Sequence, residues 1–278
     1  LAFKGLIFTD ALAMKGVAGN KSVCLQALQA GNDMVLAPRR LKEEMDAVLE
    51  AVEKGELPEE EINAKCRKVL TYKYILGLER KPFVKLSGLG TRINTPQTRD
   101  LISRLNLAAI TVLNNKNDVL PLHPDLKEAA ILNVGKPEEI EPFDRKMKKY
   151  TSFARFQLRK DLPEAEQQKL RDSLAAYRRV IVTVTEQRLA PYQSFFAKFA
   201  PESPVIYVFY TPAKSMLQIQ RAVSAAEAVV LAHASRDDVQ ERVADLLFGK
   251  ATADGRLSAS IGGLFPTGSG VTITPHTP

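Results

Sequence analysis

The chain of 278 residues contains no tryptophan, two cysteines and three histidines. Cys24 and Cys66 each stand in an apolar helical pattern without metal-ligand spacing, so we expect two buried thiols and no metal centre. Nothing in the pattern requires a disulfide between them. No run of about 18 apolar residues occurs, which excludes a membrane-spanning helix. The chain begins at Leu1 without a visible signal peptide, so the sequence leaves the localisation unknown.

Several well-known binding and catalytic motifs are also absent. The sequence has no Gly-x-Gly-x-x-Gly after a strand, no phosphate-binding Gly-Lys-Ser/Thr loop and no Gly-x-Ser-x-Gly elbow. It therefore lacks the signatures of dinucleotide binding, of P-loop nucleotide binding and of the serine hydrolases. The formal charge of +7 is spread along the chain in short clusters, which indicates solvated faces, and we expect no nucleic-acid partner.

The first part of the chain alternates short apolar strands with helical patterns. Residues 5–14 and 32–37 read as strands without polar alternation, and a helix over residues 39–53 carries apolar residues at amphipathic spacing. Two βα units cannot close a barrel of eight. Residues 1–80 are therefore predicted to be the last two units of a (β/α)8 catalytic barrel, with a linker over residues 81–97.

The second part of the chain predicts an α/β sandwich domain with a mostly parallel sheet. Apolar strand patterns alternate with helical patterns through residues 98–265, and a tail rich in proline and threonine follows at residues 266–278. The predicted strands cover residues 109–114, 129–134, 152–158, 180–185, 205–210, 228–232 and 257–261.

Asp10 stands at the carboxyl end of the first predicted strand. A βα-barrel keeps its chemistry at the carboxyl ends of its strands, so this carboxylate is a candidate catalytic group. The simpler interpretation is that Asp10 caps the turn that follows. The neighbouring Thr9 is either a hydrogen-bond donor to such a site or an ordinary β-branched strand residue.

Residues 8–14, Phe-Thr-Asp-Ala-Leu-x-Met, resemble the nucleophile segment of glycoside hydrolase family 3, in particular its bacterial β-N-acetylhexosaminidase branch. Residues 109–122 are similar to the entry of that family's C-terminal α/β sandwich, and residues 246–257 to its closing signature. Phe265-Pro266-x-Gly268 is similar to the exit of that domain. The chain departs from the family at Ser258, where proline is usual.

This resemblance implies a retaining exo-β-N-acetylglucosaminidase without a metal or organic cofactor. Asp10 would be the nucleophile, forming a covalent glycosyl-aspartate intermediate, with an acid/base about 5 Å away. Met14 would lie near the sugar pocket, although core packing is an equally good interpretation. The expected partners are an N-acetylglucosaminide derived from peptidoglycan or chitin, and the preceding barrel portion of the same protein.

The acid/base has no clear counterpart in these residues. In the resembled branch it is a histidine upstream of the nucleophile; we interpret His123 as a surface residue, His233 as structural and His276 as part of the tail. In the β-glucosidase branch the acid/base is a glutamate of the second domain, and Glu186 is the candidate by position, against an ordinary loop glutamate. We therefore expect the 278 residues alone to be nearly inactive. A non-catalytic carbohydrate-interaction module stays open as an alternative.

Overall fold

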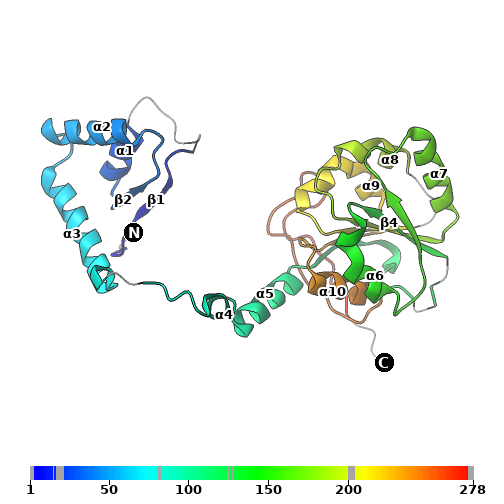
Figure 1. Ribbon diagram of the computed structural model, residues 1–278. Helices are drawn as coiled ribbons and strands as arrows, with labels where there is room; N and C mark the ends of the chain where they lie inside the picture. Colours follow the sequence, from blue (N-terminus) through cyan, green and yellow to red (C-terminus); the bar gives the residue numbers. More distant parts are fainter. Residues whose placement is uncertain are drawn as a thin grey trace. The chain divides into compact units, whose positions relative to one another are not determined.

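The computed structural model describes residues 3–14, 16, 22–80, 83–123, 125–126, 128–199 and 204–274. The chain forms two compact units, Leu1–Leu89 and Gly90–Pro278, which are described separately (Figure 1). The boundary falls inside the predicted linker, residues 81–97. In this segment α4 (Leu89–Ile93) forms and α5 (Pro96–Ala108) begins.

The first unit alternates strands and helices in the predicted order. Its elements are β1 (Phe8–Ala11), α1 (Val23–Gln29), β2 (Met34–Leu36), α2 (Leu41–Glu53), α3 (Glu59–Ile75) and the 3-10 turn η2 (Leu78–Arg80). The two strands pair in parallel. The Ser22 hydroxyl caps α1 by accepting a hydrogen bond from the Leu25 amide. Pro58 precedes α3, whose first turn carries three glutamates where the helix dipole favours negative charge.

Large apolar side chains of the first unit are exposed. Phe8 on β1 is 56% exposed, and Leu41 and Leu49 on α2 are 60% and 59% exposed. The expectation that the first strand is buried on both faces is therefore wrong, because the described residues leave this strand partly uncovered. Cys24 is buried as predicted, whereas Cys66 is exposed on α3, and both are free thiols.

The second unit is an α/β domain built on a six-stranded sheet. Its strands are β3 (Thr111–Asn115), β4 (Ala129–Val134), β5 (Ala154–Leu158), β6 (Arg179–Val184), β7 (Val205–Phe209) and β8 (Ala228–Leu231). The strand order is β3-β8-β7-β6-β4-β5, and every pairing is parallel except that of the edge strand β3 with β8. The prediction of an α/β fold with a mostly parallel sheet is confirmed.

Helices cover both faces of this sheet (Figure 1). They are, with their short 3-10 segments, η3 (Lys116–Asp118), η4 (Pro137–Ile140), α6 (Glu141–Met147), α7 (Glu164–Ala175), η5 (Ala190–Tyr192), α8 (Gln193–Lys198), η6 (Ala213–Ile219), α9 (Gln220–Ala225) and α10 (Asp237–Leu247). One core lies between the sheet and α7, α8 and α9, and contains Leu132, Val182 and Phe195. The opposite core packs α6 and α10 on Ile131 and Ile181. Because successive strand residues face opposite cores, these strands show no polar alternation.

The predicted strand over residues 257–261 is not formed. Ile261 makes one isolated bridge, in which its amide donates to the carbonyl of Phe265 at 2.8 Å. Gly262 follows with φ 52°, a left-handed conformation that turns the chain back at once. The apolar residues of segment 257–261 therefore lie in a turn that packs on the second unit.

Residues 271–273 pack on the second unit, although residues 266–278 read as a tail in the sequence. The Val271 amide donates to the Val112 carbonyl at 2.7 Å, and Ile273 exchanges hydrogen bonds with Ala253. Ile273 is buried. The end of the described chain therefore belongs to this domain's fold.

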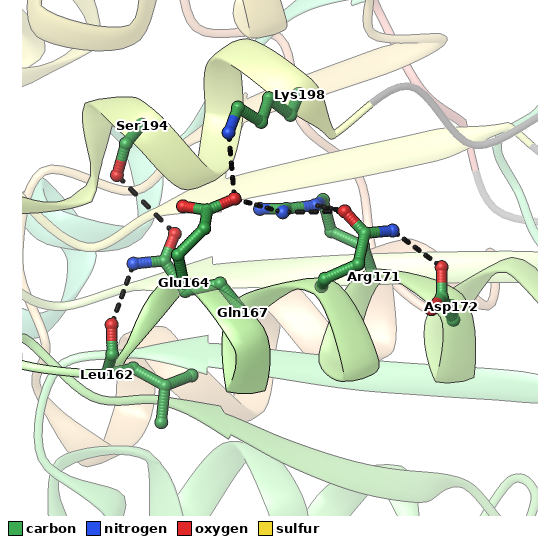
Figure 2. Close-up of polar contacts among 8 residues, drawn as sticks. Leu162, Glu164, Gln167, Arg171, Asp172, Ser194 and Lys198 are labelled. Carbon is green, nitrogen blue, oxygen red and sulfur yellow. Dashed lines mark hydrogen bonds and ion pairs between the residues drawn. The ribbon is translucent and has the colours of Figure 1, made fainter.

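A polar cluster ties α7 to α8 on one face of the sheet (Figure 2). The Glu164 carboxylate accepts hydrogen bonds from Arg171 at 2.7 Å and from Lys198 at 2.8 Å. Arg171 is 6% exposed, and its guanidinium lies 5.5 Å from the centre of the Phe195 ring. These two cations hold the pKa of Glu164 below its usual range.

Candidate active site

A bulge in β1 shapes the end of the first strand pair. Phe8 pairs with Met34 and Ala11 pairs with Leu36, so the segment from Phe8 to Ala11 has one more residue than its partner. The irregularity falls at Thr9 and Asp10. Such bulges bend a strand and redirect a side chain, and they are frequent beside active sites.

Thr9 and Asp10 make different contacts at this bulge. The Thr9 hydroxyl accepts a hydrogen bond from the Leu36 amide at 2.9 Å, and so fixes β1 to the end of β2. Asp10 is exposed, and one of its carboxylate oxygens accepts a hydrogen bond from the Ala11 amide at 2.7 Å. Thr9 therefore acts as a hydrogen-bond acceptor in the structure, whereas the carboxylate of Asp10 lies at the surface with one oxygen bonded locally.

The loops that follow β1 and β2 are linked to each other. The Leu12 amide donates to the Leu36 carbonyl at 2.9 Å, and the Arg39 guanidinium donates to the Ala13 carbonyl at 2.7 Å. Ala37 adopts φ 44°, which turns the chain sharply after β2. These bonds bring the Arg39 guanidinium beside the loop that follows β1. Arg39 is not predicted as a site residue, and its only signal in the sequence is its position shortly after β2.

The opposite end of the strand pair is held by a buried carboxylate. Asp33 accepts hydrogen bonds from the Ile7 amide at 2.8 Å and from the Lys68 ammonium at 2.7 Å. Its side chain is 7% exposed. Burial raises the pKa of Asp33, but the bonds from Lys68 and Ile7 outweigh it and the pKa is lowered overall. Asp33 thus anchors both β1 and α3 to the start of β2.

A second carboxylate joins the helices that follow the two strands. Glu44 on α2 accepts hydrogen bonds from the Ser22 hydroxyl and from the Cys24 amide, both at the start of α1. Burial raises its pKa, and these bonds lower it further than burial raises it. Burial is the main cause that raises the pKa of Cys24 to about 11, and the charge of Glu44 is the second. The Cys24 thiol is therefore an inert core group.

The other predicted site residues lie as follows. Met14 is 54% exposed in the loop after β1, so the core-packing interpretation does not hold for the described residues. His123 is exposed on a turn, and His233 is exposed just after β8 with φ 63°. His276 lies outside the described residues.

Glu186 follows β6 in the second unit and is half-buried. Its carboxylate accepts a hydrogen bond from the Arg188 amide at 2.9 Å, as a loop glutamate does in a tight turn. Among the described residues, no group of three or more histidine, cysteine or acidic side chains is placed to hold a metal ion. No helix in the described part of the chain is long and apolar enough to cross a membrane.

The first unit matches a family model. Residues 1–72 match the glycosyl hydrolase family 3 N terminal domain. Among curated proteins, the lysosomal beta glucosidase of Dictyostelium discoideum is 31% identical over 140 residues, which are 48% of this chain and 17% of that protein. Beta-glucosidase B of Emericella nidulans is 29% identical over 133 residues, 47% of this chain and 15% of that protein. The matches thus span about a sixth of each relative's length.

Solved structures share the fold over most of the chain. The structure of a beta-glucoside phosphorylase, BglX, superposes with a TM-score of 0.66 at 19% identity. The match covers 89% of this chain and 47% of the phosphorylase chain. A glycoside hydrolase family 3 beta-N-acetylglucosaminidase from a Paenibacillus species has a TM-score of 0.61 at 20% identity, over 90% and 50% of the two chains. Residues 1–72 are thus similar to the N terminal domain of glycosyl hydrolase family 3, and the solved structures show a shared fold, without distinguishing the branches of that family.

Proposed function

We propose that this chain forms part of a retaining exo-β-glycosidase in which Asp10 is the nucleophile. The observation that carries the proposal is an exposed carboxylate at a strand bulge, inside the segment that matches the glycosyl hydrolase family 3 N terminal domain. Asp10 would attack the anomeric carbon and form a glycosyl ester while the leaving oxygen is protonated; water would then hydrolyse the ester. No cofactor is needed for either step.

The surroundings of Asp10 support this role. Its exposed side chain meets a substrate without rearrangement of the strand pair, and the bond of Thr9 to Leu36 holds the strand from which it projects. Arg39 places a guanidinium beside the following loop.

The test is covalent trapping in the full-length protein. A 5-fluoro glycosyl fluoride, which keeps the substituent at C2, slows hydrolysis of the ester, and mass spectrometry of the digested protein should find the sugar on the peptide that contains Asp10. Asp10→Asn should lower kcat for aryl β-glycosides by roughly 10³-fold or more and abolish labelling.

Asp46→Asn is the matched control. Asp46 is exposed on α2 of the same unit and pairs with Lys42 at 3.0 Å, so its substitution should leave both turnover and labelling unchanged. Labelling on another carboxylate, or unchanged turnover in Asp10→Asn, would remove Asp10 from this role.

The sugar at the cleaved bond is the finer part of the proposal. We favour a terminal N-acetylglucosaminide, because residues 8–14 resemble the hexosaminidase branch. The β-glucosidase alternative is favoured by both curated relatives, which are a lysosomal beta glucosidase and beta-glucosidase B. The ratio of kcat/KM for aryl β-N-acetylglucosaminide over aryl β-glucoside in the full-length protein decides between them.

The acid/base assignment follows from the same comparison. In the glucosidase alternative Glu186 supplies the proton, and Glu186→Gln should remove the limb of the pH–rate profile that reports the general acid. In the hexosaminidase proposal that variant leaves the pH profile intact. The 278 residues expressed alone should show little or no turnover, since the histidine acid/base of that branch would come from outside them.

A further inference from the structure

The two edges of the six-stranded sheet, β3 and β5, differ in how they are protected. The ladder of β3 carries a bulge between Val112 and Asn114, and the Val112 carbonyl accepts a hydrogen bond from the Val271 amide at 2.7 Å. In contrast, β5 pairs with β4 over all five of its residues without a bulge, and it contains neither proline nor lysine. Bulges, prolines, lysines and covering segments are the usual protections of an edge strand against pairing with another chain. Among the described residues, β5 has none of these protections.

The hydrogen bonds of β4 show which backbone groups of β5 point away from the sheet. The Val134 carbonyl accepts a hydrogen bond from the loop that follows β6 at 3.0 Å, so Val134 points its backbone groups toward β6. Successive strand residues alternate, so Ile131 and Asn133 point theirs toward β5. In a parallel ladder these residues bond to the neighbours of their register partners, which are Arg155 and Gln157. The N–H and C=O groups of Arg155 and Gln157 therefore point outward, and no hydrogen bond reaches them from the described part of the chain.

We propose that β5 pairs antiparallel with β5 of a second copy of this protein, about a two-fold axis at Phe156, and so joins the two sheets into one. In this register Arg155 of each copy stands opposite Gln157 of the other. Directly opposed residues of an antiparallel pair exchange both N–H···O=C bonds where their backbone groups face each other. Each outward N–H and C=O of Arg155 and Gln157 thus gains a partner.

The side chains of β5 are self-complementary in the same register. Phe156 meets Phe156 of the second copy at a position without backbone hydrogen bonds, where opposed side chains lie closest. Phe156 is half-buried and packs edge-on against Tyr177 at 5.7 Å, so the contact extends an existing aromatic pair. Ala154 stands opposite Leu158, which matches a small apolar residue with a large one.

The charges of this segment also suit a second copy. Arg155 faces the neutral Gln157, and its own charge is paired with Asp144 at 2.9 Å, which reduces repulsion between the two arginines across the axis. Beyond the strand, Ser152 stands opposite Lys160, and both residues are exposed. Residues 152–160 therefore place no two like charges directly opposite each other. This match of backbone groups, side chains and charges favours a second copy over an unrelated extended segment.

The paired surface is small, so the dimer should be weak. A pair of five-residue strands buries less than the roughly 1,200 Å² at the lower limit of a standard interface. We expect a dissociation constant between about 1 μM and 1 mM. The dimer is therefore visible only when the protein concentration is varied over a wide range.

The test is sedimentation velocity of the full-length protein from about 1 to 500 μM, which brackets the lower part of that range. The wild type should show a monomer–dimer equilibrium. Gln157→Pro removes an outward N–H and leaves the ladder with β4 intact, because proline is tolerated on an edge strand where its nitrogen faces outward. It should weaken the dimer by about tenfold or more, since two hydrogen bonds are lost in each dimer.

Gln157→Ala is the matched control. It loses the same side-chain bonds as Gln157→Pro, to Asn133 at 2.9 Å and to the Gly135 carbonyl at 2.7 Å, but it keeps the backbone N–H. Its dimer should be nearly as tight as that of the wild type. Denaturant unfolding of both variants verifies that they fold.

A second pair of variants tests the register without touching the strand. Ser152→Glu places a negative charge opposite Lys160 and should tighten the dimer, whereas Ser152→Lys should weaken it. The two dissociation constants should differ by roughly threefold or more, because each dimer contains two such pairs. Both substitutions are at an exposed position, so they decide the question if Gln157→Pro does not fold.

Three results would overturn the proposal. They are a wild type that stays monomeric over the whole range, a Gln157→Pro dimer as tight as that of Gln157→Ala, and equal dissociation constants for the two Ser152 variants. The surface contains no residue of the first unit, so each of these results leaves the Asp10 experiment unaffected.

Discussion

At the scale of single residues, the Thr9 hydroxyl replaces a missing backbone hydrogen bond at the β1 bulge. Thr9→Val keeps the shape of the side chain but removes the acceptor for the Leu36 amide. We expect the free energy of unfolding to fall by about 0.5–1 kcal/mol, since Leu36 is half-exposed and water can replace the bond in part. In the full-length protein, kcat should fall more than KM rises, because Asp10 is no longer held in place.

Thr9→Ser keeps the hydroxyl, so its free energy of unfolding and its kcat should be close to those of the wild type. Urea unfolding and steady-state kinetics of the two variants provide the measurement. If Thr9→Val and Thr9→Ser were equally impaired, the methyl group of Thr9 rather than its hydrogen bond would be the important feature.

Asp33 makes the stability of the first unit depend on pH. Its pKa is lowered in the folded state, so its stabilising effect is complete above the unfolded pKa, about 3.9, and is lost as the pH falls through the folded value. Asp33→Asn removes the charge that Lys68 pairs with. We expect this variant to be less stable by about 1.5–3 kcal/mol at pH 7, the strength of hydrogen bonds to charged groups.

The two proteins should converge in acid, because a protonated Asp33 resembles asparagine. Urea titrations of wild type and Asp33→Asn at pH 7, 5 and 3 measure this difference. A stability gap that stays constant down to pH 3 would show that the ion pair with Lys68 is not its cause.

At the scale of elements, Arg171 connects α7 to α8 across one face of the sheet (Figure 2). Arg171→Ala removes a long buried side chain from beside Phe195, and we expect a loss of about 2–3 kcal/mol in the free energy of unfolding. Arg171→Met keeps most of the packing and should cost less than half as much. Guanidinium unfolding of both variants tests whether packing or charge dominates at this contact, and equal losses would favour charge.

The elements that the sequence predicts well are those with both faces buried. Strands β4, β6 and β7 appear in the sequence as unbroken apolar runs because helices cover the sheet on both sides. The segment 257–261 carries a similar apolar pattern, yet it forms only isolated pairings. An apolar sequence pattern indicates that residues are buried. Residues buried in a packed turn give the same pattern as residues buried in a strand.

The candidate site is predictable only in part, for a similar reason. The place of Asp10 at the end of a strand follows from the local pattern. The bulge does not, since it depends on Thr9 meeting Leu36, which lies 27 residues further along the chain. The bond of Arg39 to Ala13 and the ion pair of Lys68 with Asp33 are likewise long-range contacts, and no local spacing indicates them.

At the scale of the whole molecule, the two units differ in how much apolar surface they cover. The second unit buries a core on each face of its sheet. In the first unit, Leu41, Met45 and Leu49 lie four residues apart on α2 and are 60%, 56% and 59% exposed. Monomeric proteins rarely leave a contiguous apolar stripe of this kind open. We propose that further βα units of the same protein cover it.

Met45→Gln tests whether further βα units cover α2. The substitution should be favourable in the 278-residue chain and unfavourable in the full-length protein. In the 278-residue chain the side chain is exposed, so the variant should bind less of a hydrophobic dye and aggregate less. In the full-length protein, a buried Met45 makes the same variant lose about 2–3 kcal/mol of stability, from lost apolar burial and an unpaired amide. Leu217→Gln, at a 40% exposed site of the second unit, is the control and should be nearly neutral in both. Unchanged stability of full-length Met45→Gln would mean that no further unit covers α2.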